Sequence, residues 1–243
     1  MKKVALITGS SRGLGKAMVE AFAEQNYRVV VHYNKSKANA HAIINSLEQK
    51  GLEAMAIYAP LDNAQDIQKA ISNIIERFGR IDVLVNNAGV KEDASIFDMS
   101  LETFTQVMNI NVIGAWIMTK HVAEVMKKQG SGRIINISSG VGTYGREFQT
   151  NYAGSKGALN AITKSLSKEL GPYNITVNAI APGLIETDMT ADVDPEHKEA
   201  YRKQIPLQRL GKPKDIANAA LFLAGDGADF ISGQIIHVNG GLR

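Results

Sequence analysis

The sequence contains no cysteine among its 243 residues. Disulfide bonds, thiol catalysis and thiolate metal sites are therefore excluded, and the composition is typical of reducing compartments. Long apolar runs are also missing, because no stretch approaches the roughly 18 residues that a transmembrane helix requires. The apolar run from Val4 to Ile7 is interrupted by Gly9 too soon for a signal peptide. We therefore expect a soluble cytoplasmic protein that is not bound to a membrane.

The chain also lacks a large excess of either charge. Its 27 basic and 24 acidic residues give a net charge of +3, and the basic residues are scattered. A nucleic-acid partner is therefore not expected. The histidines lack the spacing of metal ligands, so that no metal is predicted. They are His32, His41, His121, His197 and His237.

Short apolar segments alternate with longer segments of helical periodicity along the whole chain. The short segments are nearly continuous in apolar residues, which indicates strands buried on both faces of a parallel sheet. The alternation predicts one α/β domain, residues 1–243, with a Rossmann-type, doubly wound, seven-stranded parallel sheet flanked by helices. The predicted strands are 4–7, 29–32, 54–58, 81–85, 133–137, 176–180 and 235–238. The predicted helices lie near 14–25, 38–50, 64–78, 100–127, 152–170 and 213–224.

One long segment, residues 184–211, shows no strong periodicity. It is polar and contains Pro195 and Pro206. Long irregular segments within compact domains are usually functional or disordered, and we interpret this one as a substrate lid. Its acidic residues are most simply a solvated face. They are Asp192, Asp194, Glu196 and Glu199.

Three glycines follow the first predicted strand, in the segment Thr8-Gly9-Ser10-Ser11-Arg12-Gly13-Leu14-Gly15. Glycine lets the chain turn sharply, and it lets a pyrophosphate approach backbone N–H groups at the positive end of a helix. A purely structural turn would use one glycine, so three at this spacing favour a dinucleotide site. Arg12 adds a positive charge within the turn.

The residues after the second predicted strand bear on the choice of dinucleotide. Sites specific for NAD usually place Asp or Glu there, to accept a hydrogen bond from the ribose 2′-hydroxyl. This chain has His32-Tyr33-Asn34-Lys35-Ser36 instead, without a carboxylate. Lys35 and Arg12 could converge on a 2′-phosphate, and the alternative is that Lys35 is a solvated loop residue. NADP(H) is therefore expected as the cofactor.

Tyr152 and Lys156 are four residues apart within a predicted helix. This spacing places a phenol and an ammonium on the same face. A tyrosine hydroxyl has an ordinary pKa near 10, so a fixed positive charge helps it to exchange a proton at neutral pH. The pair is a candidate proton donor with its activator.

Together these motifs resemble the short-chain dehydrogenase/reductase family. Their order and spacing match along the whole chain, and within the family they look most like bacterial 3-oxoacyl-acyl-carrier-protein reductases. The subgroup rests on residues 181–189 and on the closing His-Val-Asn-Gly-Gly. The residues that carry the family resemblance are Gly9, Gly13, Gly15, Asn86, Asn87, Ala88, Gly89, Asn111, Ser139, Tyr152, Lys156, Pro182 and Gly183.

The resemblance implies a set of cofactor contacts. The glycine-rich turn would hold the phosphates, Asp62 would face the adenine, and Ile185 would close over the nicotinamide. Asp62 has an alternative role as the N-cap of the helix that begins at Ala64, and it could do both. The residues expected to bind the cofactor are Gly9, Ser10, Ser11, Arg12, Gly13, Leu14, Gly15, Asn34, Lys35, Asp62, Asn63, Asn87, Ala88, Gly89, Tyr152, Lys156, Pro182, Gly183 and Ile185.

Charge develops on the oxygen of a carbonyl group when a hydride adds to its carbon, and a hydroxyl aimed at that oxygen stabilises the transition state. The residues alone allow either Ser138 or Ser139 in this role, and the resemblance implies Ser139. It also implies that Tyr152 donates the proton, with a pKa lowered by Lys156 and by the oxidised nicotinamide. Lys156 would in addition bind the nicotinamide ribose, and Asn111 would anchor a water relay.

The resemblance implies an NADPH-dependent reduction of a 3-oxoacyl thioester, on acyl carrier protein or coenzyme A, by a homotetramer in fatty acid biosynthesis. The chain departs from that subgroup where two arginines dock the carrier, because the aligned residues are Gly130 and Tyr173. Lys127, Lys128 and Arg133 could substitute in part. An alternative is a reductase or dehydrogenase of another small carbonyl, sugar or polyol. A non-catalytic nucleotide sensor is a third reading, against which the intact catalytic set argues.

Overall fold

The computed structural model describes residues 2–187 and 194–242. Its parallel sheet has seven strands in the order β3-β2-β1-β4-β5-β6-β7, which confirms the predicted fold class. The chain reverses its direction across the sheet between β1 and β4, and ligands of doubly wound folds bind at such a switch point. The strands are β1 (Val4–Ile7), β2 (Arg28–Tyr33), β3 (Ala54–Tyr58), β4 (Val83–Asn86), β5 (Gly132–Ile137), β6 (Ile175–Pro182) and β7 (Ile235–Val238).

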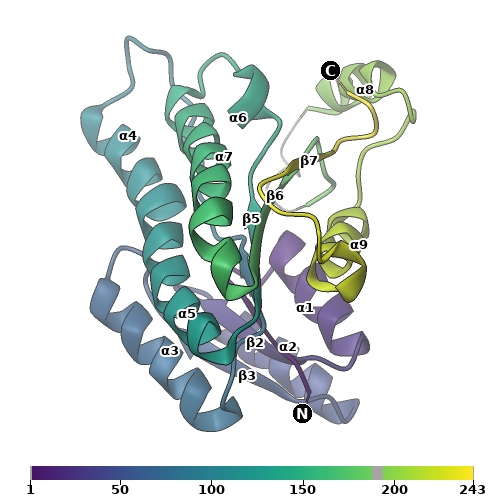
Figure 1. The fold of residues 1–243 in the computed structure, drawn as a ribbon. Helices are drawn as coiled ribbons and strands as arrows, with labels where there is room; N and C mark the ends of the chain where they lie inside the picture. Colours follow the sequence, from purple (N-terminus) through teal and green to yellow (C-terminus); the bar gives the residue numbers. More distant parts are fainter. Residues whose placement is uncertain (1, 188–193, 243) are drawn as a thin grey trace.

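Helices cover both faces of the sheet, as Figure 1 shows. Strand β1 is apolar at every position because both of its faces are buried. Ala5 and Ile7 pack into one core, and Val4 and Leu6 pack into the other. The first core lies under α1 (Gly13–Glu24), α2 (Lys37–Gln49) and α9 (Pro213–Ala224). The second face carries α3 (Ala64–Phe78), α4 (Leu101–Met108), α5 (Ala115–Gln129) and α7 (Thr150–Leu170).

The helix predicted near 100–127 is interrupted. Between α4 and α5 the chain forms a π-helical segment, η1 (Asn109–Gly114). Gly114 packs closely against Leu61 in the β3–α3 connection, since a Cβ on Gly114 would lie 2.6 Å from the carbonyl oxygen of Leu61. π-Helical turns within longer helices are frequent at functional sites.

The segment predicted as one irregular lid contains a helix, so that part of the prediction was wrong. Helix α8 (Pro195–Gln204) begins after Asp194, whose side chain accepts a hydrogen bond of 2.8 Å from the backbone N–H of Glu196. Proline at the first helical position suits the start of a helix. Ile185 and Gly211 pair in an isolated parallel bridge at the base of the segment. Residues 188–193, including Asp192, lie outside the described residues.

In the described ranges, three short helical turns were not predicted, because each has only three or four residues. They are α6 (Val141–Tyr144), η2 (Gly171–Tyr173) and η4 (Asp226–Ala228). Within the described part of the chain, none of the helices has the length and hydropathy needed to cross a membrane.

Candidate active site

The predicted catalytic residues meet at the carboxyl ends of the central strands. Ser139 follows β5, and Tyr152 and Lys156 lie in the first two turns of α7. Asn111 comes from η1, which lies in the chain between α4 and α5. Three separate chain segments therefore contribute to one site.

The two serines after β5 point to different partners. Ser139 forms a side-chain hydrogen bond with Tyr152, and its Oγ accepts a bond of 3.2 Å from the N–H of Val141. Ser138 is buried and donates from its Oγ to the carbonyl oxygen of Lys156 at 3.2 Å. The structure thus brings Ser139, and not Ser138, to the phenol.

Lys156 is almost fully buried, and its Nζ donates a hydrogen bond of 2.8 Å to the carbonyl oxygen of Ile137. The same Nζ lies 5.6 Å from the centre of the Tyr152 ring. Burial penalises the charged ammonium and lowers the pKa of Lys156 to about 8. For Tyr152, on the preceding turn, burial instead raises the pKa.

The pKa of Tyr152 is raised, mainly because burial disfavours the phenolate. The hydrogen bond from Ser139 opposes this effect, and the negative charge of Asp93 adds to it. The prediction that Lys156 lowers the pKa of Tyr152 was therefore wrong for the protein without its cofactor. The ammonium lies beside the ring and is held by Ile137, so Ser139 is the group that favours the phenolate.

Asn111 is fully buried and uses both ends of its amide. Its Oδ1 accepts from the N–H of Val90 at 2.8 Å, and its Nδ2 donates to the carbonyl oxygen of Val90 at 2.9 Å and to Ser155 Oγ at 3.0 Å. A Cβ on Gly89 would lie 3.2 Å from Asn111 Oδ1 and 3.4 Å from Lys156 Nζ. Asn111 and Lys156 therefore flank the same glycine.

The glycine-rich turn after β1 has the shape that the sequence predicted. Gly9 has a φ of +61°, and a Cβ there would lie 2.7 Å from the Cα of Ala88. A Cβ on Gly15 would lie 2.5 Å from the carbonyl oxygen of Gly9. Gly13 also has a positive φ, of +55°, but a Cβ there would meet only open space. Close packing requires glycine at Gly9 and Gly15, whereas Gly13 faces open space.

The first turn of α1 is open to an anion. Among the described residues, no side chain caps this helix and no acidic residue lies in its first turn. Its unpaired N–H groups and positive dipole end can therefore bind a phosphate. Ser10 has a different role, since it is buried and donates to the carbonyl oxygen of Ile7 at 2.7 Å. Ser11 and Leu14 are partly buried beside it.

His32 is a residue that the sequence reasoning did not identify. Its Nδ1 accepts a hydrogen bond of 2.9 Å from the N–H of Gly9, and its Nε2 lies 2.7 Å from the carbonyl oxygen of Ala59. The ring is therefore neutral with its hydrogen on Nε2, and burial lowers its pKa to about 4. A histidine within an apolar strand next to the glycine-rich turn was the available signal.

The segment after β4 supports the same turn. Asn87 donates from Nδ2 to the carbonyl oxygens of Thr8 and Gly9, at 2.8 and 3.1 Å. Thr8 Oγ1 accepts from the N–H groups of Asn87 and Ala88, at 2.9 and 3.0 Å. Asn86 instead points into the core, where its Nδ2 donates to Thr119 and Asn136.

The residues expected near the 2′-phosphate and the adenine are exposed. Arg12, Asn34 and Lys35 lie at the carboxyl ends of the neighbouring strands β1 and β2, and Asp62 follows β3. The alternative that Asp62 caps α3 was wrong. Asn63 is the N-cap, and its Oδ1 accepts from the N–H groups of Gln65 and Asp66 at 3.0 and 3.2 Å.

The end of β6 contributes Pro182 and Gly183. The carbonyl oxygen of Pro182 accepts a bond of 3.1 Å from the N–H of Gly140, which ties this strand to the Ser139 turn. Ile185 is buried, and a Cβ on Gly211 would clash with its side chain. A contact between Ile185 and a nicotinamide stays a prediction.

A cavity of about 260 Å³ lies between the α6–α7 loop and α8. The guanidinium of Arg146 lies 5.6 Å from the ring centre of Tyr201, so it links the loop to the helix. The cavity is lined by Arg146, Leu184, Asp194, His197 and Tyr201.

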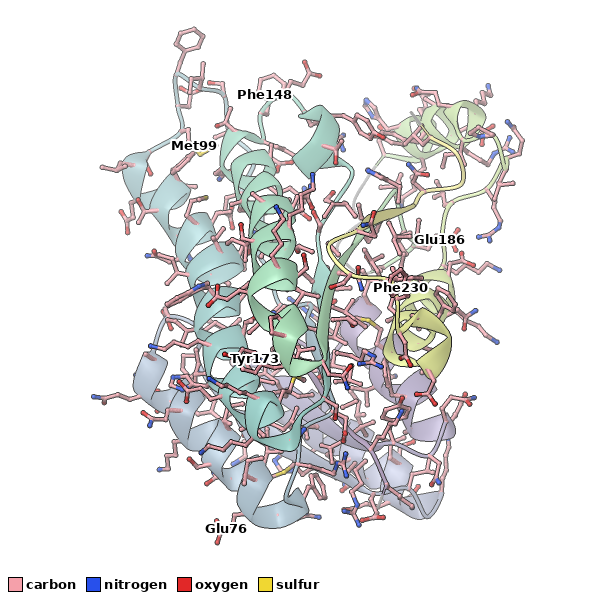
Figure 2. The ribbon with its side chains drawn as sticks, in the orientation of Figure 1. Glu76, Met99, Phe148, Tyr173, Glu186 and Phe230 are labelled. Atoms are coloured by element: carbon pink, nitrogen blue, oxygen red, sulfur yellow. The ribbon has the colours of Figure 1, made fainter. Side chains whose placement is uncertain are left out.

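The positions aligned with carrier-docking arginines lie far from this site. Gly130 ends α5 with a φ of 73°, where an arginine would be strained. Tyr173 follows α7, at the opposite end from Phe148 in Figure 2, and its ring lies 4.4 Å from Lys127 Nζ. Arg133 was suggested as a partial substitute, and its largely buried side chain pairs with Asp229, which counts against a docking role.

Comparison with known proteins agrees with this geometry. A family model described as "Enoyl-(Acyl carrier protein) reductase" matches residues 9–243. The chain belongs to the short-chain dehydrogenase/reductase family.

Individual relatives define the likeness more narrowly. The chain is 42% identical to a 3-oxoacyl-[acyl-carrier-protein] reductase FabG of Staphylococcus aureus, over 100% of this chain and 98% of the relative. A FabG of Aquifex aeolicus is 43% identical, with 99% and 97% covered. The crystal structure of a putative gluconate dehydrogenase from Agrobacterium tumefaciens is 30% identical, with a TM-score of 0.96 over 99% of this chain and 95% of the other.

Proposed function

We propose that this oxidoreductase uses NADPH to reduce 3-oxoacyl thioesters to 3-hydroxyacyl thioesters. The observation that carries the proposal is the hydrogen bond between Ser139 and Tyr152, next to the buried Lys156. The full-length identity to 3-oxoacyl-acyl-carrier-protein reductases supports the substrate class.

The two hydroxyls have complementary tasks. The substrate carbonyl oxygen accepts hydrogen bonds from Ser139 and Tyr152, which strengthen as negative charge builds on it. Bound NADPH supplies the hydride that adds to the carbonyl carbon. Tyr152 then gives its proton to the oxygen, and its raised pKa keeps that proton in place until the charge develops. Asn111 anchors the relay that returns a proton through Lys156.

The residues present fit a nicotinamide dinucleotide. The open face of Gly13 and the uncapped first turn of α1 suit the pyrophosphate. Lys156 would bind the nicotinamide ribose, and Arg12 and Lys35 would bind the 2′-phosphate that distinguishes NADP from NAD. The family supports a nicotinamide cofactor, and the preference for NADP(H) is our inference from these two cations.

Residues 184–211 act as the substrate lid of one domain that spans residues 1–243. Helix α8 already contacts the α6–α7 loop through Arg146 and Tyr201, and the cavity between them can receive the acyl group. We also propose that the protein is a homotetramer, which light scattering tests. We further propose that acyl carrier protein presents the substrate, which binding measurements test.

A second candidate is the reduction or oxidation of a sugar or polyol. The likeness to a putative gluconate dehydrogenase favours it, although at a lower identity than the thioester reductases. A nucleotide sensor without catalysis has no need of a proton donor, which counts against that reading.

One activity screen separates these candidates. NADPH oxidation is measured with acetoacetyl-coenzyme A, a carrier-linked 3-oxoacyl chain, simple ketones and keto sugar acids. Turnover with the two thioesters at least 10-fold above the other substrates supports the proposal. A higher kcat/KM for a sugar acid would replace it with the second candidate.

A further inference from the structure

The start of the catalytic helix is fastened to the segment that follows β4. Gln149, the residue before α7, donates from Nε2 to both carboxylate oxygens of Asp93, at 3.1 Å each. Asn151 donates from Nδ2 to the carbonyl oxygen of Glu92 at 2.9 Å. The N–H of Ala94 donates to the carbonyl oxygen of Phe148 at 2.9 Å. Three consecutive residues of one segment thus hold three of the four residues that precede Tyr152.

The side chains that donate these hydrogen bonds are buried, so water cannot replace their partners. Gln149 and Asn151 are 5% and 0% exposed, so their amide groups depend on these partners. Asn151 Oδ1 also accepts a bond of 2.7 Å from the N–H of Tyr152, which passes the constraint to the catalytic residue. Phe148 has a φ of +62°, an uncommon conformation for a bulky residue. Such conformations persist where the surrounding structure determines them.

Asp93 also influences the site through its charge. Its carboxylate raises the pKa of Tyr152, although this effect is smaller than that of burial. The segments that meet at the start of α7 carry further charged groups. Lys156 lies on α7, Asp93 and its partner Lys91 follow β4, and the exposed Arg146 and Glu147 lie on the α6–α7 loop. Lys91 Nζ lies 3.0 Å from Asp93 Oδ2, which partly neutralises the carboxylate.

We propose that Asp93 and Gln149 are positioning residues for Tyr152, with Gln149 fixing the first turn of α7 and Asp93 supplying both its anchor and a negative charge. This inference rests on the proposed catalytic role of Tyr152. The Gln149 amide contributes through geometry, and the Asp93 carboxylate contributes through its charge.

The electrostatic contribution is tested with Asp93→Asn, which keeps an acceptor for Gln149 and removes the charge. Titration of tyrosine labelled with ¹³C at Cζ, with the Tyr152 signal identified through Tyr152→Phe, measures ionisation without any turnover. The Tyr152 signal is expected to titrate at lower pH in Asp93→Asn than in the wild type. Asp98→Asn is the matched control, because Asp98 lies on the same segment and bonds to Ser95. An unchanged or higher titration midpoint in Asp93→Asn overturns this part.

The geometric contribution is tested with Gln149→Leu and Gln149→Glu. Displacement of a catalytic group by about 1 Å can cost on the order of 100-fold in rate, so we expect kcat to fall at least 10-fold in both variants. NADPH affinity, measured by fluorescence, should stay within about twofold. Gln149→Glu places two carboxylates together, and adding Asp93→Asn should restore kcat at least fivefold by rebuilding the bond with donor and acceptor exchanged.

The outcomes are distinct. A Gln149→Leu protein that folds, as circular dichroism reports, and keeps kcat within twofold of the wild type refutes positioning. Failure of the double variant to recover, with its fold intact, does the same. A wild type without thioester reduction contradicts the proposed function, and in that case the tyrosine titration still decides the effect of Asp93.

Discussion

The Nζ of Lys156 lies 5.6 Å from the ring centre of Tyr152, one turn further along the same helix. The ammonium is held by the carbonyl oxygen of Ile137, while the phenol bonds to Ser139. The two side chains therefore share a face without a direct hydrogen bond between them. This arrangement leaves the phenol oxygen to Ser139 and to the substrate.

Tyr152→Phe should abolish turnover, because the change removes the proton donor and very little volume. General acid catalysis typically contributes about 10² to 10⁴-fold. NADPH affinity should remain nearly unchanged, which fluorescence titration of the same protein checks. A variant that keeps more than about a tenth of the wild-type kcat, where chemistry limits the rate, would show that Tyr152 is not the acid.

Replacing both Arg12 and Lys35 by Ala should reduce the preference for NADPH over NADH at least 10-fold. Each charged hydrogen bond to the 2′-phosphate contributes about 1.5 to 3 kcal/mol, and both side chains are exposed and available. The ratio of kcat/KM values for the two cofactors measures the effect. Equal use of both cofactors by the wild type would contradict the assignment to NADP.

Gly9→Ala should destabilise the fold more than Gly13→Ala, although both glycines have a positive φ. The methyl group at Gly9 would lie 2.7 Å from the Cα of Ala88, whereas the one at Gly13 meets nothing within 4 Å. Overpacking typically costs about 1 to 3 kcal/mol beyond the shared backbone strain. Urea unfolding without cofactor measures the difference, and equal losses in the two variants would contradict the packing argument.

The stability of the fold should decline as the pH falls from about 6.5 towards 4 because of His32. The buried ring has a pKa of about 4, whereas the same histidine in the unfolded chain has an ordinary value near 6.5. Within this window the unfolded state binds a proton that the folded state refuses, so the full contribution is present above pH 6.5. The shift corresponds to on the order of 3 kcal/mol. His32→Asn should flatten this slope in urea unfolding across the pH range, whereas the exposed His41→Asn should not.

The preference for a carrier-linked substrate over its coenzyme A thioester should be about 10-fold or less in kcat/KM. Gly130 and Tyr173 supply no charge, and Lys127 lies against the Tyr173 ring, so Lys128 and Lys127 alone would steer an acidic carrier. Such attraction is screened beyond about 8 Å at physiological salt, and the preference should shrink there. A preference of 100-fold or more that survives 0.15 M salt would show that another surface docks the carrier.

Much of the fold was predictable because buried strands leave a strong pattern. All seven strands were placed within about two residues, since β1 and β6 are buried along their whole length. Helix α8 was missed because it is short and polar; its local features are the Asp194 cap and the exposed Glu199–Arg202 pair. Local capping of this kind leaves no apolar periodicity to detect.

The site was predictable where motifs combine and less so where it depends on burial. The pairing of Tyr152 and Lys156 followed from their spacing, and the choice of Ser139 over Ser138 followed from the family resemblance. The raised pKa of Tyr152 did not, because it depends on how deeply the phenol lies and on Asp93, which is distant in sequence. The role of His32 likewise depends on contacts with Gly9 and Ala59, which only the folded sheet brings together.

The number of residues in the π-helical segment η1 determines the direction in which the Asn111 side chain points. An α-helix advances about 100° per residue, so one additional residue in a turn rotates everything beyond it by that angle. The core-facing sides of α4 and α5 are therefore out of phase when residues 101–129 are treated as one regular helix. Deletion of one residue from η1 would restore a continuous helix and turn either the Asn111 amide or the apolar side of α5 away from its partners. The extra residue thus allows one continuous helical segment to place Asn111 at the site and the apolar side of α5 in the core.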